Sequence, residues 1–176
     1  MFGQPAGAIM QVAFTVPDLL VAVEQWAQVL AIGPFFALEH FHLDEFRYRG
    51  RPCKADFSLA IAFSGSMSFE LIQQHDASPS VYRELIERRG YGFHHVALAT
   101  IDFDAELTRL TAGGSAVAMS GVVPVGAGSR LAYVDTCDLI GGMTELIEVN
   151  AAVEGLFTQL RDAAATWDGK EALRRM

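Results

Sequence analysis

Two short segments of this chain share one pattern. Residues 11–18 read Gln-Val-Ala-Phe-Thr-Val-Pro-Asp, and residues 95–102 read His-Val-Ala-Leu-Ala-Thr-Ile-Asp. Each segment begins with a side chain that can bind a metal and continues through an apolar run typical of a strand. Each ends in an Asp, a residue that commonly caps the N-terminus of a helix. The repetition therefore predicts two similar strand-to-helix units, with a site built between two halves of the chain.

The rest of the sequence predicts the same order of elements in both halves, namely strand, helix and three strands. The expected strands are 9–16, 35–42, 54–64, 67–74, 93–100, 115–123, 129–136 and 144–150. The expected helices are 18–31, 78–89, 102–113 and 152–167. We divide the chain into a first module (8–76), a connecting helix (77–91), a second module (92–150), and a C-terminal helix and tail (151–176). We expect the end of the tail, from Trp167 onward, to be frayed.

Composition excludes several classes of protein. The 176 residues carry a net charge of −8 without a cluster of Lys and Arg, so nucleic-acid binding is not expected. Cys53 and Cys137 lack metal spacing and indicate free thiols in a reducing compartment. Residues 1–7 do not resemble a signal peptide, and no apolar run is long enough for a transmembrane helix. We expect a cytoplasmic protein without membrane contact, and a homodimer, because a small curved sheet leaves apolar edges to cover.

Strand alternation predicts which polar side chains can meet, because successive residues point to opposite faces. In strands 9–16 and 93–100 the bulky residues share one face, which leaves Gln11 and His95 on the other. In strand 67–74, Glu70 points away from its bulky neighbours. In strand 144–150 we assign Ile147 and Val149 to the packing face, so Glu148 takes the opposite face with Leu146 and Asn150. Glu145 then points away from Glu148, toward solvent.

Three stretches carry a resemblance to a known family: Val12–Asp18, Gly92–Ala97 and Leu146–Val149. With them, the chain resembles the vicinal oxygen chelate superfamily, which includes glyoxalase I, methylmalonyl-CoA epimerase, extradiol dioxygenases and bleomycin-resistance proteins. The resemblance covers roughly residues 8–150. It implies an α+β fold in which paired βαβββ modules form an open, curved, mixed sheet around a central cavity. It also implies a divalent metal held by the first and fourth strands of each module, at Gln11, Glu70, His95 and Glu148.

One imidazole and three oxygen donors suit Zn²⁺, Ni²⁺, Co²⁺ or Mn²⁺. A carbonyl bound to such an ion is polarised, and the proton on the adjacent carbon becomes more acidic. We expect Glu148 to be the base that removes this proton, with Glu70 as the second carboxylate on the other side. The predicted function is that of a metal-dependent isomerase, epimerase or lyase acting on a small carbonyl compound.

The ligand set also separates members of the family. Gln, Glu, His and Glu in this order resemble glyoxalase I of the eukaryotic type, whereas methylmalonyl-CoA epimerases typically carry His first and Gln second. The arginine that those glyoxalases use for glutathione would fall near Thr15, so another substrate is expected. A non-catalytic binding protein of the bleomycin-resistance type is the alternative. An extradiol dioxygenase is a weaker one, because its iron site resembles a two-His, one-carboxylate set.

Three other histidines have less specific surroundings. His94 should point to the packing side of its strand, where a structural role is expected. His40 and His42 alternate on an expected strand and could form a second metal pair, but no third ligand has an obvious spacing. We therefore expect a rim or loop role for His40 and His42.

Overall fold

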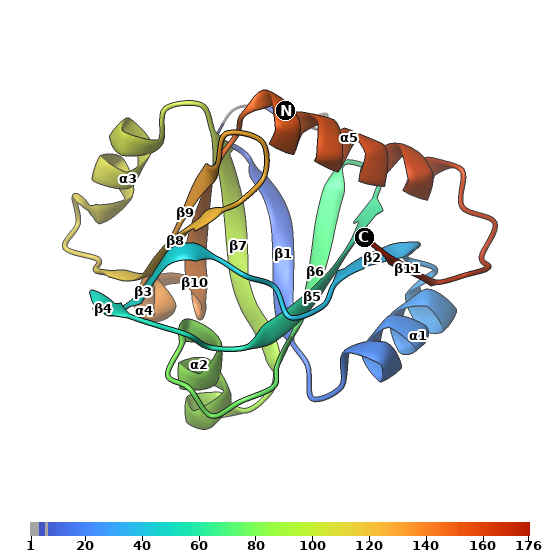
Figure 1. Ribbon diagram of the computed structural model, residues 1–176, viewed down its shortest axis with the longest axis horizontal. Helices are drawn as coiled ribbons and strands as arrows, with labels where there is room; N and C mark the ends of the chain where they lie inside the picture. Colours follow the sequence, from blue (N-terminus) through green and yellow to red (C-terminus); the bar gives the residue numbers. More distant parts are fainter. Residues whose placement is uncertain (1–3, 6) are drawn as a thin grey trace.

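A computed structural model describes residues 4–5 and 7–176, shown in Figure 1. Residues 1–3 and 6, which contributed to the expectation that the chain lacks a signal peptide, lie outside the described residues. None of the helices formed by the described residues is both long enough and apolar enough to cross a membrane.

The first half of the chain contains six strands and two helices. In chain order they are β1 (Ile9–Thr15), α1 (Leu19–Leu30), β2 (Phe35–Leu38), β3 (Asp44–Tyr48), β4 (Arg51–Pro52), β5 (Phe57–Ser64), β6 (Met67–Gln74) and α2 (Val81–Arg89). The second half consists of β7 (Gly92–Thr100), α3 (Phe103–Thr111), β8 (Val117–Val123), β9 (Ser129–Val134), α4 (Cys137–Ile140), β10 (Met143–Glu148), α5 (Ala151–Ala165) and β11 (Leu173–Arg175).

The strands form one mixed sheet in the order β11-β2-β5-β6-β1-β7-β10-β9-β8-β3-β4. Strands β1 and β7 pair antiparallel at its centre and join the two halves, while β6 runs parallel to β1 and β10 runs parallel to β7. The two halves thus have the same order of elements around the centre, β1-α1-β2-β5-β6 and β7-α3-β8-β9-β10. This arrangement confirms the predicted α+β fold with an open, curved, mixed sheet.

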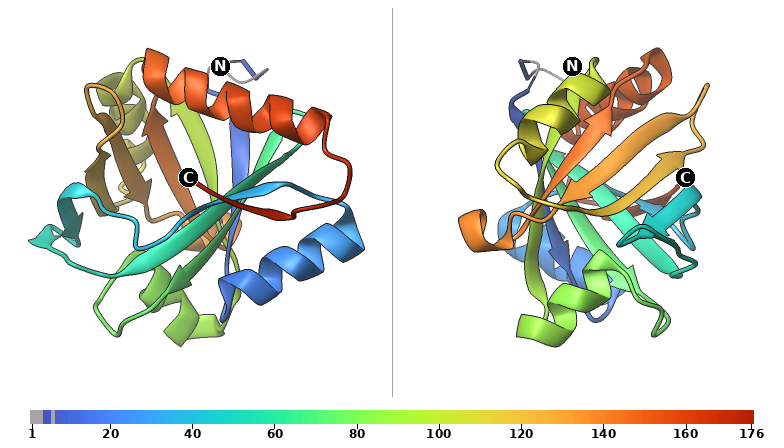
Figure 2. Two further views of the ribbon diagram at one scale, coloured as in Figure 1. Left: turned by 45° about the vertical axis from the view of Figure 1, so that its right-hand side comes forward. Right: turned by 90° about the vertical axis from the view of Figure 1, so that its left-hand side faces the viewer.

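The helices divide between the two faces of the sheet. On the outer face, α1 packs against β5 and β6, and α3 packs against β9 and β10. On the inner face, α5 packs along β5 and crosses above the central strands (Figures 1 and 2). The expected Asp caps are confirmed, because Asp18 accepts a hydrogen bond from Val21 N and Asp102 accepts one from Ala105 N.

The hairpin β3–β4 departs from a simple pair of modules. It is inserted between β2 and β5 in the first half, yet β3 pairs antiparallel with β8 of the second half. The chain therefore passes from one end of the curved sheet to the other, and buried side chains of this segment, including Leu43 and Phe46, join the inner core. The insertion helps to enclose the space inside the sheet.

Three local expectations were wrong. Helix α2 begins after Ser80, whose side chain accepts a hydrogen bond from Arg83 N, and not after Ser78-Pro79. His40 and His42 lie in a connection after β2, not on a strand.

The third concerns the C-terminal tail, which is paired rather than frayed. Strand β11 adds to the edge of β2, and Trp167 packs over Gly33. At Gly33 a Cβ would lie 2.8 Å from the Trp167 ring, so only glycine leaves room for this contact.

Candidate functional site

A cavity of about 140 Å³ lies inside the curved sheet, under α5. Most of its wall is apolar and aromatic, with Phe41 and Phe57 on one side and Phe157 of α5 above. The polar side chains that reach it are Gln11, Glu70, Tyr82, Ser129, Tyr133 and Glu145. No lysine or arginine is among the described residues that line it. The cavity thus combines an apolar wall with carboxylates and an amide.

Glu70, His95 and Glu145 converge at this polar region. His95 Nε2 lies 3.1 Å from Glu145 Oε2 and 3.5 Å from Glu70 Oε2. Each residue offers a ligand atom, and these atoms all lie within 4.8 Å of one another. All three side chains are buried. Two carboxylates and one imidazole held this close, away from water, form a site that can bind a cation or exchange protons.

The strand registers explain why these side chains meet. Ala13 of β1 lies opposite Glu70 on one neighbouring strand and opposite His95 on the other. Ala97 of β7 lies likewise between Gln11 and Glu145. The two alanines are small, so the longer side chains on either side can lean together over them. The predicted shared face of Gln11, Glu70 and His95 is therefore confirmed, while their roles as metal ligands stay predictions.

Two buried polar atoms of this cluster lack a partner. Across the described residues, neither His95 Nε2 nor Gln11 Oε1 has a protein hydrogen-bond partner. The Gln11 side chain does hydrogen-bond Glu70, which leaves its oxygen unpaired. Buried acceptors of this kind are rare unless a ligand, an ion or ordered water satisfies them. The donor set of imidazole nitrogen, amide oxygen and two carboxylates fits a divalent metal.

His94 orients the His95 ring. His94 Nε2 lies 3.1 Å from Val81 O, and because a carbonyl only accepts, this nitrogen carries the hydrogen. Burial holds the pKa of His94 well below its ordinary value, so the ring is neutral and its Nδ1 accepts. The contact of 2.9 Å between His94 Nδ1 and His95 Nδ1 then makes His95 Nδ1 the donor. The other ring nitrogen of His95, Nε2, faces the two carboxylates.

The cluster also shifts the protonation of its neighbours. Burial, and then the negative charge of Glu145, raises the pKa of Glu70 well above its usual range, although the Gln11 hydrogen bond acts in the opposite direction. Burial and the nearby carboxylates also raise the pKa of Tyr82 and Tyr133. Their hydroxyl oxygens lie 3.1 Å apart, and both groups stay protonated donors at neutral pH. Sequence analysis did not identify these two tyrosines.

The predicted position of Glu148 was wrong, and Glu145 occupies the place assigned to it. Glu148 Oε1 and Oε2 lie 2.7 and 2.8 Å from the guanidinium of Arg130, outside the His95 cluster. Glu148 does share a face with Leu146, but that face packs under α3, where Leu146 contacts Leu98 and Phe103. Ile147, assigned to the packing face, lines the cavity instead.

A signal in the sequence identifies Glu145. The tripeptide Glu-Leu-Ile occurs at residues 70–72 of β6 and again at 145–147 of β10, the corresponding strands of the two halves. Aligning these tripeptides pairs Glu145 with Glu70. This second internal repeat was overlooked because Ile147 and Val149 are bulky. Their bulk favoured the packing face for them, and therefore the cavity face for Glu148.

Comparisons with known proteins agree with this architecture. The family model described as "Glyoxalase/Bleomycin resistance protein/Dioxygenase superfamily" matches residues 10–133. Solved structures with a similar fold include a hypothetical protein of Bacillus halodurans C-125, at 16% identity and a TM-score of 0.58, covering 83% of this chain and 96% of that one. The methylmalonyl-CoA epimerase of Mycobacterium tuberculosis is 22% identical with a TM-score of 0.56, covering 88% and 98%.

A second methylmalonyl-CoA epimerase structure, of a selenomethionine protein, is 15% identical with a TM-score of 0.52, covering 84% of this chain and 99% of that one. At these identities the structures show a shared fold. The search of curated proteins found no match. The family match spans most of the chain, including both central strands β1 and β7. The chain therefore belongs to the glyoxalase/bleomycin resistance protein/dioxygenase superfamily.

Proposed function

We propose that this protein is a metal-dependent isomerase or epimerase that moves a proton on the carbon next to a substrate carbonyl. The observation that carries the proposal is the buried Glu70–His95–Glu145 cluster, in which His95 Nε2 faces two carboxylates without a hydrogen-bond partner. Gln11, Glu70, His95 and Glu145 would hold the metal, and either carboxylate would leave the ion when it transfers a proton. When bound, a divalent ion supplies a Lewis acid that polarises the carbonyl and acidifies the adjacent C–H.

Two carboxylates can perform the proton transfers. They come from β6 and β10, which lie on opposite sides of the central pair β1 and β7. One carboxylate removes the proton from one face of the carbon, and the other, in its acid form, returns a proton to the opposite face. We assign Glu145 as the base and Glu70 as the acid, and the reverse reaction exchanges their roles.

The cavity wall restricts the substrate. Its apolar and aromatic lining suits an alkyl or aryl group, and its described lining residues contain no lysine or arginine that would pair with a carboxylate or phosphate. We therefore expect the part of the substrate that enters the cavity to carry the carbonyl group and no charge. A lyase would use the same proton removal on a substrate with a leaving group on the next carbon. Expectations of a homodimer and a cytoplasmic location stay predictions.

Metal analysis and proton exchange test the proposal. Protein purified without chelator should contain about one equivalent of Zn²⁺, Ni²⁺, Co²⁺ or Mn²⁺ in the buried cluster. Uncharged 2-hydroxy ketones, incubated with the protein in D₂O, should incorporate deuterium next to the carbonyl, as followed by NMR. Glu145→Gln should reduce this exchange by at least about a hundredfold, whereas Glu148→Gln serves as the matched control and should retain it.

The opposite results have a clear meaning. If Glu148→Gln abolishes exchange and Glu145→Gln does not, the assignment of the base is wrong. The apolar cavity under α5 favours a second candidate, a non-catalytic binding protein. Tight binding of an apolar ligand without exchange in any metal-loaded form would support that candidate over the isomerase.

A further inference from the structure

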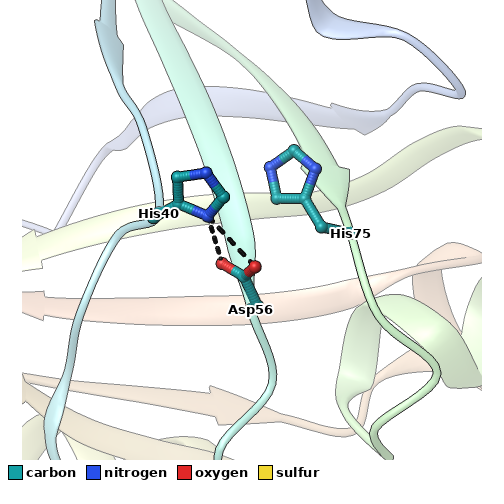
Figure 3. Close-up of side chains that lie close together, drawn as sticks. All are labelled: His40, Asp56 and His75. Carbon is teal, nitrogen blue, oxygen red and sulfur yellow. Dashed lines mark hydrogen bonds and ion pairs between the residues drawn. The ribbon is translucent and has the colours of Figure 1, made fainter.

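A second group of metal-binding side chains lies at the ends of three neighbouring strands, apart from the cavity. His40 follows β2, Asp56 precedes β5 and His75 follows β6 (Figure 3). These strands are adjacent in the sheet, in the order β2-β5-β6, so residues far apart in the chain meet at one end of it. Each side chain offers a ligand atom, and the three atoms lie within 4.8 Å of one another.

The side chains face each other closely. His40 Nδ1 lies 2.8 Å from Asp56 Oδ1 and 3.0 Å from Asp56 Oδ2. The rings of His40 and His75 have centroids 4.9 Å apart and an interplanar angle of 37°. Figure 3 shows the two rings next to each other, with the Asp56 carboxylate below them. Two imidazoles and a carboxylate thus surround one small space.

The backbone and a buried serine hold this geometry. The His75 N–H donates to Asp56 O over 2.8 Å, which links two of the three residues directly. Ser58 Oγ accepts from the His40 N–H over 3.0 Å and lies 2.7 Å from His75 Nε2. Ser58 is 3% exposed, so this anchor belongs to the core. Such preorganisation reduces the conformational entropy that a ligand would have to overcome.

His40 has an unusual backbone conformation. Its φ of 49° lies in the left-handed region, which a side chain other than glycine rarely adopts. In this conformation the imidazole lies beside Asp56, and strained residues of this kind often occur at functional sites. Neighbouring His42 contacts Asp44 instead, 3.1 Å away, and is not a member of the cluster.

We propose that His40, Asp56 and His75 form a second divalent-metal site, on the outside of the cavity wall. Two nitrogens and one carboxylate oxygen suit Zn²⁺, Ni²⁺, Co²⁺ or Cu²⁺, and hard ions such as Mg²⁺ would bind poorly. The His40 side chain is 70% exposed, so water would complete the coordination. The ion would replace the direct contact between His40 and Asp56. It would replace the Ser58–His75 hydrogen bond only where the ion binds Nε2 of His75, the nitrogen that makes this bond.

The position of the site connects it to the cavity. Phe41 and Phe57 directly follow His40 and Asp56 in the sequence and line the cavity on the other side of the wall. Their ring centroids lie 5.9 Å apart, and Phe41 N donates to Phe57 O over 2.7 Å. A metal that joins the two preceding residues would fix this aromatic wall. The site does not depend on the proposed reaction in the interior.

Zinc titration of metal-free protein tests the proposal. Calorimetry should show that the wild type binds one more equivalent of Zn²⁺, with micromolar affinity, than either His75→Ala or Asp56→Asn. The matched control is His42→Ala. It removes an exposed histidine two residues from His40 that is not a member of the cluster, and the variant should bind as the wild type does. Glu145→Gln should retain this surface site, so the two sites are counted separately.

A second measurement does not depend on variants. Sub-stoichiometric Ni²⁺ or Cu²⁺ should broaden the imidazole NMR signals of His40 and His75 before that of His42. The proposal is overturned if His75→Ala and Asp56→Asn bind as much Zn²⁺ as the wild type with unchanged affinity. It is also overturned if His42→Ala loses the same equivalent, if the three histidine signals broaden together, or if Zn²⁺ binds there only at millimolar concentration.

Discussion

His94 Nδ1 lies 2.9 Å from His95 Nδ1, and the far nitrogen of His94 contacts Val81 O at the start of α2. The two rings are nearly perpendicular, at 89°. The Val81 carbonyl thereby makes His95 Nδ1 the donor to His94, while His95 Nε2 faces Glu70 and Glu145. The start of α2 is thus connected to the buried cluster through His94.

This relationship predicts that His94→Gln weakens metal binding at the buried cluster by about 10- to 100-fold, as is usual when the partner of a metal-binding histidine is removed. The glutamine amide cannot fix the His95 ring in the same orientation. Competition with a chromophoric chelator measures the affinity, and circular dichroism verifies the fold. Unchanged affinity in a folded variant would show that His94 only fills space.

The ion pair of Arg130 and Glu148 should stabilise the fold at neutral pH, lose this effect in acid, and leave metal content unchanged. The Arg130 hydrogen bonds lower the pKa of Glu148 in the folded state. Its stabilisation is therefore present above the unfolded pKa of about 4.3 and lost as pH falls through the lower folded value. Because the Arg130 side chain is 42% exposed, the pair contributes less than about 1 kcal/mol.

Urea unfolding of the wild type and Glu148→Gln at several pH values measures this effect. The difference in free energy of unfolding should be largest near neutral pH and shrink below about pH 4. A difference that grows as the solution becomes more acidic would contradict the assignment.

Phe157→Ala should open the cover of the cavity. The Phe157 ring packs edge-on against Phe63, with centroids 6.1 Å apart, and lines the cavity from α5. Because Phe157 already borders the cavity, we expect the free energy of unfolding to fall by about 3 kcal/mol, near the lower end of the range for Phe→Ala in a core. Thermal unfolding measures the loss, and Gln159→Ala, on the exposed side of α5, is the control. Equal stability of the two variants would show that α5 does not close the cavity.

Gly142→Ala should disturb the buried cluster from behind. A Cβ at Gly142 would lie 2.5 Å from the Phe93 ring and 2.7 Å from His94 O, so the backbone that carries His94 and His95 must shift. We expect a destabilisation of about 1–3 kcal/mol and weaker metal binding. Gly113→Ala is the matched control, since a Cβ there meets nothing within 4 Å. A Gly142→Ala protein as stable as this control would contradict the packing.

Local sequence patterns predicted much of the fold. The Asp caps and the alternation along β1, β6 and β7 depend on neighbouring residues only, so Gln11, Glu70 and His95 could be assigned to one face. The same rule failed for Glu148, because a period of two defines two faces without stating which one a helix covers. The packing of Leu146 under α3 determined that, and placed Glu145 in the cavity.

The sequence by itself therefore determined the repeated units, the capped helices and three of the four polar side chains at the centre of the sheet. The tertiary structure decided the fourth, Glu145, whose strand face alternation alone had assigned wrongly, and it decided the pairing of the tail with β2. It also decided the meeting of His40, Asp56 and His75, because these residues come from three strand ends separated along the chain. Side chains at such separations meet through strand register and helix packing, which are properties of the whole sheet and not of any local segment.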